Sequence, residues 1–129
     1  MMTKTVNIGG KEVRMRASAL IPRLYRVQFG RDMISDMRQL LKSYNKAVKS
    51  LGKDVTEEQR QAAQLSMMDL TIFENVAYMM IKHAGEDVPP TPDEWLDSID
   101  GIFSIYNVMP TILELWGENQ KTTSIPKKK

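Results

Sequence analysis

The fold of this chain is decided by the stretch Leu65-Ser-Met-Met-Asp-Leu-Thr-Ile-Phe-Glu-Asn-Val-Ala-Tyr-Met-Met-Ile-Lys-His83, which contains no proline or glycine. Its apolar residues recur at steps of three and four, as they do on one side of a helix. Further apolar residues widen that side until only a narrow polar strip remains. The apolar positions are Leu65, Met67, Met68, Leu70, Ile72, Phe73, Val76, Ala77, Met79, Met80 and Ile81. A helix of this kind is typical of the middle of a bundle, where neighbours cover it on several sides.

The composition is that of one small domain without cysteine. A chain of 129 residues is expected to form a single domain, here residues 1–120, and is long enough to bury a core. The absence of cysteine excludes disulfides and thiolate metal sites and fits a reducing compartment. Asp69, Glu74 and Lys82 interrupt the most apolar window, and residues 1–16 lack the apolar block of a signal peptide. The sequence therefore predicts a soluble cytoplasmic protein that does not enter a membrane.

Charge is distributed unevenly along the chain. Residues 1–53 carry 12 Lys or Arg and 3 Asp or Glu, whereas residues 54–120 carry 2 and 13. Residues 121–129 add 4 lysines and no acid, so the net charge of the whole chain is only +2. Such asymmetry fits nucleic-acid binding by the basic part. It equally fits attraction between the two parts, within one molecule or head to tail in a homo-oligomer, and the near balance of charge favours this second reading.

Patterns along the rest of the chain predict a mainly α fold, a small bundle of about four to five helices with an N-terminal β-hairpin. Residues 5–16 alternate polar and apolar positions around Gly9-Gly10, which is typical of a hairpin turn. Helical periodicity, capping residues and breakers then define five helices and a flexible basic tail. The predicted helices are residues 18–29, 31–51, 56–84, 92–99 and 104–117, and the tail is residues 121–129.

The apolar residues of the first two helices are expected to point into the core. In the first helix these are Leu20, Leu24, Val27 and Phe29. In the second they are Met33, Ile34, Met37, Leu40, Leu41, Tyr44, Val48 and Leu51. Arginine and lysine occupy the opposite side of both helices, so that side is expected to face solvent.

The residues needed for catalysis are nearly absent, so the chain is not expected to be an enzyme. His83 is the only histidine and has no cysteine or GxSxG serine to accompany it. Its place near a helix end makes it a favourable partner of the helix dipole. Asp93 and Asp97 lie on one helical side and have ligand chemistry for a divalent metal, but acids in the first turn of a helix are common. No catalytic, cofactor-binding or metal site is predicted.

Nucleic acid and protein remain as possible partners. Basic residues between positions 11 and 49, with Tyr25 and Tyr44 among them, fit an electrostatic footprint, although no helix-turn-helix spacing is present and the acidic part would repel phosphate. Ten methionines in 129 residues is a high content, and methionine adapts to irregular apolar partners. The alternative is that these methionines only fill the core. The candidate client-binding residues, to the extent that they are exposed, are Met33, Met37, Met67, Met68, Met79 and Met80.

Several stretches together resemble one protein family. They are VNIGGKEVRMRASA (6–19), PRLYR (22–26), FGRD (29–32), DLTIFENVAY (69–78), TPDEWL (91–96), ILELW (112–116) and TTSIPKKK (122–129). In these stretches, which cover almost the whole chain, the protein resembles the tail assembly chaperones of long-tailed bacteriophages and their prophages. None of the stretches is a catalytic signature.

The resemblance implies a non-enzymatic assembly factor. Such a chaperone binds the long, helical tape measure protein, keeps it soluble and helps the tail tube protein to assemble around it. It acts in the cytoplasm of the host bacterium and is absent from the mature virion. The resemblance also implies a second, longer form of the chain made by programmed ribosomal frameshifting, and the codons of Lys127–Lys129 form an A-rich stretch that fits a slippery site. Two alternatives remain: a small nucleic-acid-binding phage protein, and a structural tail or connector component of the virion.

Overall fold

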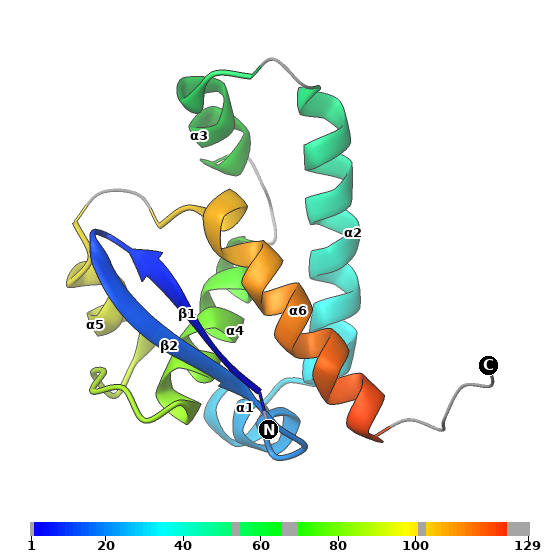
Figure 1. Ribbon diagram of the computed structural model, residues 1–129, viewed down its shortest axis with the longest axis vertical. Helices are drawn as coiled ribbons and strands as arrows, with labels where there is room; N and C mark the ends of the chain where they lie inside the picture. Colours follow the sequence, from blue (N-terminus) through cyan, green and yellow to red (C-terminus); the bar gives the residue numbers. More distant parts are fainter. Residues whose placement is uncertain (1, 53–54, 66–69, 101–102, 124–129) are drawn as a thin grey trace.

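A computed structural model describes residues 2–52, 55–65, 70–100 and 103–123, which form a helical bundle with a hairpin laid across it (Figure 1). The predicted class, a mainly α bundle with an N-terminal β-hairpin, is confirmed. In chain order the elements are β1 (Met2–Ile8), β2 (Lys11–Ala17), α1 (Ile21–Phe29), α2 (Met33–Leu51), α3 (Glu57–Leu65), α4 (Leu70–His83), α5 (Pro92–Asp97) and α6 (Ile105–Thr123).

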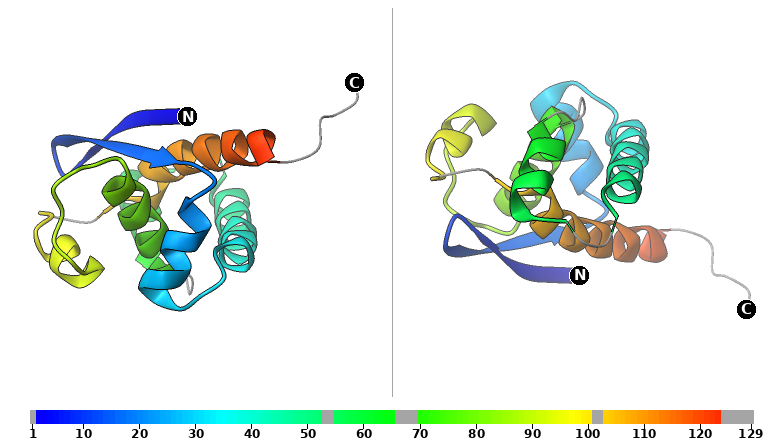
Figure 2. Two further views of the ribbon diagram at one scale, coloured as in Figure 1. Left: turned by 90° about the horizontal axis from the view of Figure 1, so that it is seen from below. Right: turned by 90° about the horizontal axis from the view of Figure 1, so that it is seen from above.

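The hairpin is longer than residues 5–16 but turns where the sequence predicts. Gly9 and Gly10 both have positive φ, 60° and 84°, which matches the two-residue turn that glycine favours. The Asn7 side chain supports the turn by accepting a hydrogen bond from the Gly10 amide at 3.1 Å. β1 pairs antiparallel with β2 from Met2 opposite Ala17 to Ile8 opposite Lys11. The apolar side of the hairpin covers α4 and α6, so the helices beneath the hairpin stabilise it (Figure 2).

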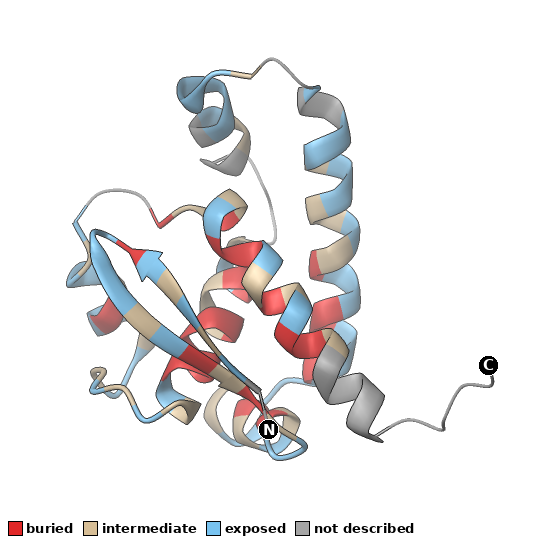
Figure 3. Ribbon diagram, in the orientation of Figure 1, coloured by how far each residue is buried: buried red, intermediate tan, exposed pale blue. Residues whose placement is uncertain are grey.

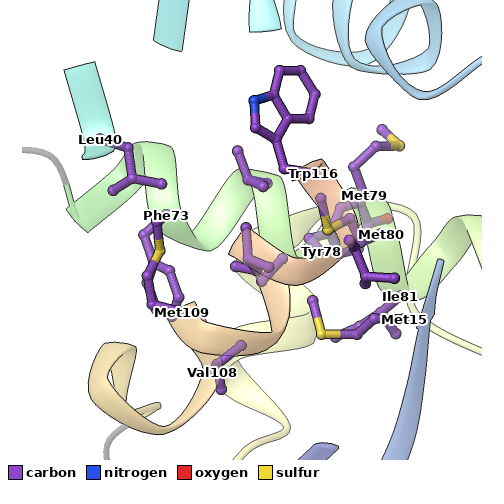
Figure 4. Packing of buried hydrophobic residues seen from close by; sticks show 14 of the residues in the cluster. Met15, Leu40, Phe73, Tyr78, Met79, Met80, Ile81, Val108, Met109 and Trp116 are labelled. Atoms are coloured by element: carbon purple, nitrogen blue, oxygen red, sulfur yellow. The ribbon is translucent and has the colours of Figure 1, made fainter. Parts of the chain in front are cut away.

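Helix α4 is the centre of the molecule, as its sequence predicts. Eight of its fourteen residues are buried, and β2, α1, α2, α5 and α6 all contact it. Figure 4 shows α4 side chains packed with residues from the hairpin and from α6, among them Met15 and Met109. The buried residues of α4 are Ile72, Phe73, Val76, Ala77, Tyr78, Met79, Met80 and Ile81.

The single helix predicted for residues 56–84 is two helices, α3 and α4, and residues 66–69 between them lie outside the described residues. The predicted start is confirmed, because Thr56 and Gln59 form the reciprocal capping box. The Thr56 hydroxyl accepts from the Gln59 amide at 3.1 Å, and the Gln59 side chain accepts from the Thr56 amide at 3.0 Å. α3 is polar and contacts α2 (Figure 1).

The other helix ends differ from the prediction by a few residues. α1 begins at Ile21 rather than 18, because the Ser18 hydroxyl accepts from the Leu20 amide in a turn that precedes the helix. α2 begins at Met33, where Asp32 is the N-cap residue and accepts from the Ile34 amide. α5 ends at Asp97. α6 continues to Thr123, so the first three residues of the predicted tail are helical, and residues 124–129 lie outside the described residues.

Four apolar residues expected in the core are instead exposed: Leu20 (46%), Val27 (79%), Ile34 (51%) and Val48 (42%). Figure 3 shows that many of the residues along α2 are exposed. The cause in α1 is that Ile21 and Tyr25, one turn apart, take the inward positions. Tyr25 is fully buried, and Val27 lies two positions further along, on the other side of the helix. In α2 the buried stripe is Met33, Asp36, Met37 and Leu40.

Tyr25 is buried because its hydroxyl has a partner on the next helix. The hydroxyl donates to Asp36 Oδ2 at 2.8 Å, and Arg31 donates to the same carboxylate through Nε at 2.7 Å and Nη2 at 2.8 Å. Asp36 is the only buried charged residue in the part of the chain that the structure describes. The hydrogen bonds from Arg31 hold the pKa of Asp36 below its usual 3.8. This cluster joins α1 to α2 through a buried carboxylate.

Replacing Asp36 by alanine is expected to destabilise the domain by about 1–3 kcal/mol, because it leaves the buried Tyr25 hydroxyl without an acceptor. Urea unfolding at pH 7 measures the change. The exposed variant Asp97→Ala is the matched control and should change the free energy of unfolding by less than about 0.5 kcal/mol.

The difference between wild type and Asp36→Ala should depend on pH. Because the pKa of Asp36 is lowered in the folded state, its contribution is fully present above the unfolded pKa of 3.8 and is lost as the pH falls through the folded pKa. A difference that stays constant from pH 6 to pH 2 would contradict this account of the cluster.

Candidate protein-binding grooves

The part of the chain that the structure describes has neither of two kinds of site, metal clusters and membrane-spanning helices. Among residues 2–52, 55–65, 70–100 and 103–123, no three histidine, aspartate or glutamate side chains are grouped so that they could hold a metal ion. Within the same ranges, no helix is long and apolar enough to cross a membrane. Asp93 lies in the first turn of α5, where Thr91 caps the helix by accepting from the Glu94 amide at 3.3 Å. Its position is that of an acid at the positive end of a helix dipole.

The candidate client-binding methionines must be corrected. Met33, Met37, Met79 and Met80 are at most 3% exposed and belong to the hydrophobic core. Met67 and Met68 lie outside the described residues. The four described methionines fill the core because they lie on the inward stripes of α2 and α4. These four side chains therefore expose too little surface to bind a partner by themselves, and only Met79 borders a groove, the one between α1 and α4 described below.

The predicted basic footprint is exposed, but its aromatic part is not. Tyr25 is buried against Asp36, so its ring is not available to stack on a base. Tyr44 is half-buried, and its ring centroid lies 6.0 Å from that of Tyr106. The exposed cations of α1, α2 and the connection between them are Arg23, Arg26, Arg31, Arg38, Lys42, Lys46 and Lys49.

An apolar groove runs between α1 and α4, with a volume of about 460 Å³. We call it the α1–α4 groove. Each helix forms one side of the groove, since the lining residues recur at helical spacing on each helix. The lining residues are Arg23, Leu24, Val27 and Gln28 from α1, and Met79, Lys82 and His83 from α4.

The groove has an apolar floor between two cations. Leu24 and Val27 form the α1 side, and Val27 is the most exposed of the large hydrophobic residues in the described chain. Arg23 and Lys82 are exposed on the two helices, and the Lys82 ammonium lies 5.8 Å from the centroid of the Tyr78 ring. An apolar strip flanked by positive charge suits an amphipathic partner. The groove could not be predicted from the sequence, because the helical periodicity predicted that Val27 is buried in the core.

His83 closes one end of the groove and joins it to the hairpin. Its Nε2 lies 2.8 Å from the Ser18 hydroxyl, and Arg16 donates to its backbone carbonyl at 3.5 Å. Burial lowers the pKa of His83 below its usual 6.5, and the Arg16 charge lowers it further. The lowered pKa favours the neutral imidazole at pH 7, and the side chain contacts the Ser18 hydroxyl.

A second groove, of about 520 Å³, separates the hairpin turn from α5 and the segment before it. We call it the hairpin–α5 groove. The hairpin approaches α5 closely, since a Cβ atom at Gly9 would lie 3.1 Å from Ile99 Cγ2. Glu86 connects the segment to the hairpin by accepting from the Arg14 amide at 2.8 Å and from Arg14 Nε at 3.1 Å. The lining residues are Ile8, Gly9, Lys11, Glu12, Val13, Glu86, Asp87, Val88, Pro89, Trp95, Ser98, Ile99 and Asp100.

Comparisons of this chain with protein-family models, with curated proteins and with solved structures found no match.

The neutral state of His83 can be tested by NMR titration. The imidazole of the wild-type protein should titrate below 6.5, and Arg16→Gln should move the pKa upward but leave it below 6.5, because burial is the larger cause. Since the folded pKa is lowered, the contribution of His83 to stability is present above pH 6.5 and falls as the pH drops through the folded pKa. Arg26→Gln on α1 serves as the control and should leave the titration unchanged; a wild-type pKa above 6.5 would show a charged histidine.

Proposed function

We propose that this chain is a non-enzymatic tail assembly chaperone and that it holds a helical segment of a phage tape measure protein in the α1–α4 groove. The observation that carries the proposal is the 79% exposure of Val27 beside an apolar groove. A large hydrophobic residue kept in water next to a concave apolar strip is typical of a protein-binding surface. Helical clients are bound in this way when their apolar stripe lies in such a groove.

The dimensions of the groove suit weak, repeated binding. α1 has nine residues and is therefore about 13 Å long, so it contacts only two or three turns of a client helix. A contact of this size is weak, and many copies along one client would protect it while each copy is released easily. A chaperone that leaves before the tail is complete needs such weak single contacts, repeated along the client. The proposal therefore places the protein in the host cytoplasm and not in the mature virion.

The tail tube protein and a frameshifted long form of the same chain belong to the proposal as further partners. They rest on the family resemblance and not on the grooves. The exposed cations of α1 and α2 are the observation that favours the alternative, a nucleic-acid-binding protein. The third possibility, a structural component of the tail, differs from the proposal in that the protein would stay in the virion.

Replacing Val27 by aspartate should impair client binding without unfolding the domain, because Val27 is exposed. Loss of one apolar contact and introduction of a charge should weaken affinity for the tape measure protein by about tenfold or more. Co-expression with the tape measure protein, followed by measurement of its soluble fraction, gives the readout. The matched control is Val48→Asp on α2, which changes an exposed valine that does not line the α1–α4 groove.

Two results would contradict the proposal. If the wild-type protein leaves the tape measure protein insoluble but binds duplex DNA with strong salt dependence, the nucleic-acid alternative is correct. If mass spectrometry finds the protein in purified virions in many copies, it is a structural component.

A further inference from the structure

The hairpin–α5 groove has an apolar floor that no element of the described chain covers. Ile8 and Trp95 lie deepest, at 7% and 6% exposure, and both line the groove. Val13, Val88 and Ile99 are half-buried and pack against the same core. A hollow of about 520 Å³ with this floor is large enough for a few side chains of an extended segment.

The rim of the same groove is acidic. Four acids and one lysine line it: Glu12, Glu86, Asp87, Asp100 and Lys11. Glu86 is paired with Arg14, but Glu12, Asp87 and Asp100 have no ion-pair partner among the residues that the structure describes. Three unpaired carboxylates around an apolar floor attract a segment that combines apolar and basic residues.

We infer that this groove receives residues 124–129, Ser-Ile-Pro-Lys-Lys-Lys, of a second copy of the chain. The segment has the required chemistry in the required order: Ile125 and Pro126 are apolar, and Lys127–Lys129 follow with three positive charges. No acidic side chain follows Glu118, so the side chains of the segment carry positive charge only. Pro126 favours an extended backbone, which suits a groove between a strand and a loop.

The occupant belongs to another copy because α6 carries the segment away from the groove. The groove lies at the start of α6, since Asp100 precedes Ile105 by only five residues. α6 has 19 residues and is about 28 Å long, so Thr123 lies about that far from its first turn. Six further residues reach at most about 20 Å. Figures 1 and 2 agree, because α5 and the hairpin turn lie on one side of the molecule and the end of α6 on the other.

A contact between the end of one copy and the opposite side of the next is heterologous. It gives an open chain or a ring, or a closed dimer where two copies exchange their segments with each other. The groove and the segment that fills it are separate from the α1–α4 groove, so this inference does not depend on the proposed chaperone function.

A charge exchange between two full-length variants tests the inference. One variant carries Asp87→Lys and Asp100→Lys in the groove, and the other carries Lys127→Glu, Lys128→Glu and Lys129→Glu in the segment. Sedimentation velocity at a protein concentration on the order of 0.1 mM should show self-association of the wild type and monomers of either variant alone. An equimolar mixture of the two variants should associate again, because each then meets a partner of opposite charge.

Further variants and a change of salt concentration serve as controls in the same sedimentation experiment. Lys42→Glu, Lys46→Glu and Lys49→Glu change three exposed lysines of α2 and should leave association as in the wild type. Ile125→Ser should weaken association several-fold with the charges intact, and raising the salt from about 0.05 to 0.5 M should weaken that of the wild type. The inference is overturned if the wild type is monomeric, if either groove or segment variant alone associates like the wild type, or if the mixture remains monomeric. Circular dichroism of each variant confirms that it is folded.

Discussion

Burial of α4 is the constraint on which the rest of the structure depends. A helix with eight buried residues is stable only if other elements cover it on several sides. α1, α2, α5 and α6 and the hairpin do so, and the hairpin, which would be marginal alone, gains its stability from that contact. The same burial removes the α4 methionines from the surface. Their adaptable side chains fill an irregular core between strand and helices, and the proposed client binding depends on the groove between α4 and α1.

The sequence predicted those features that depend on local chemistry or on a strong period. The apolar period of α4, the Gly9-Gly10 turn and the Thr56 capping box are each encoded within a few residues, and each is present. The features that the sequence could not predict depend on contacts between elements. Tyr25 is inside only because Asp36, eleven residues away on the next helix, accepts its hydrogen bond and is itself neutralised by Arg31. Once Tyr25 points inward, Val27 must point outward, because the two residues lie on opposite sides of the helix. The sequence of α1 alone does not show which of these two residues is buried.

The two grooves differ in charge and share a connection. The α1–α4 groove has Arg23 and Lys82 beside its floor, whereas carboxylates surround the hairpin–α5 groove. Each groove draws on both parts of the chain, since Lys82 comes from the acidic part and Glu12 from the basic part. Strand β2 contacts both, because Arg16 donates to the His83 carbonyl at one groove and Arg14 binds Glu86 at the other. The short stretch from His83 to Glu86 thus connects the two grooves through strand β2.

Hydrogen–deuterium exchange with and without the tape measure protein tests the central claim most directly. If the client lies in the α1–α4 groove, amides of Ile21–Phe29 should exchange at least about tenfold more slowly in the complex, because α1 is covered on its exposed side and opens less often. The carboxyl-terminal half of α2 should exchange at the same rate in both states. Unchanged exchange in α1 together with protection along the basic side of α2 would contradict the claim and would place the partner on the cationic surface instead.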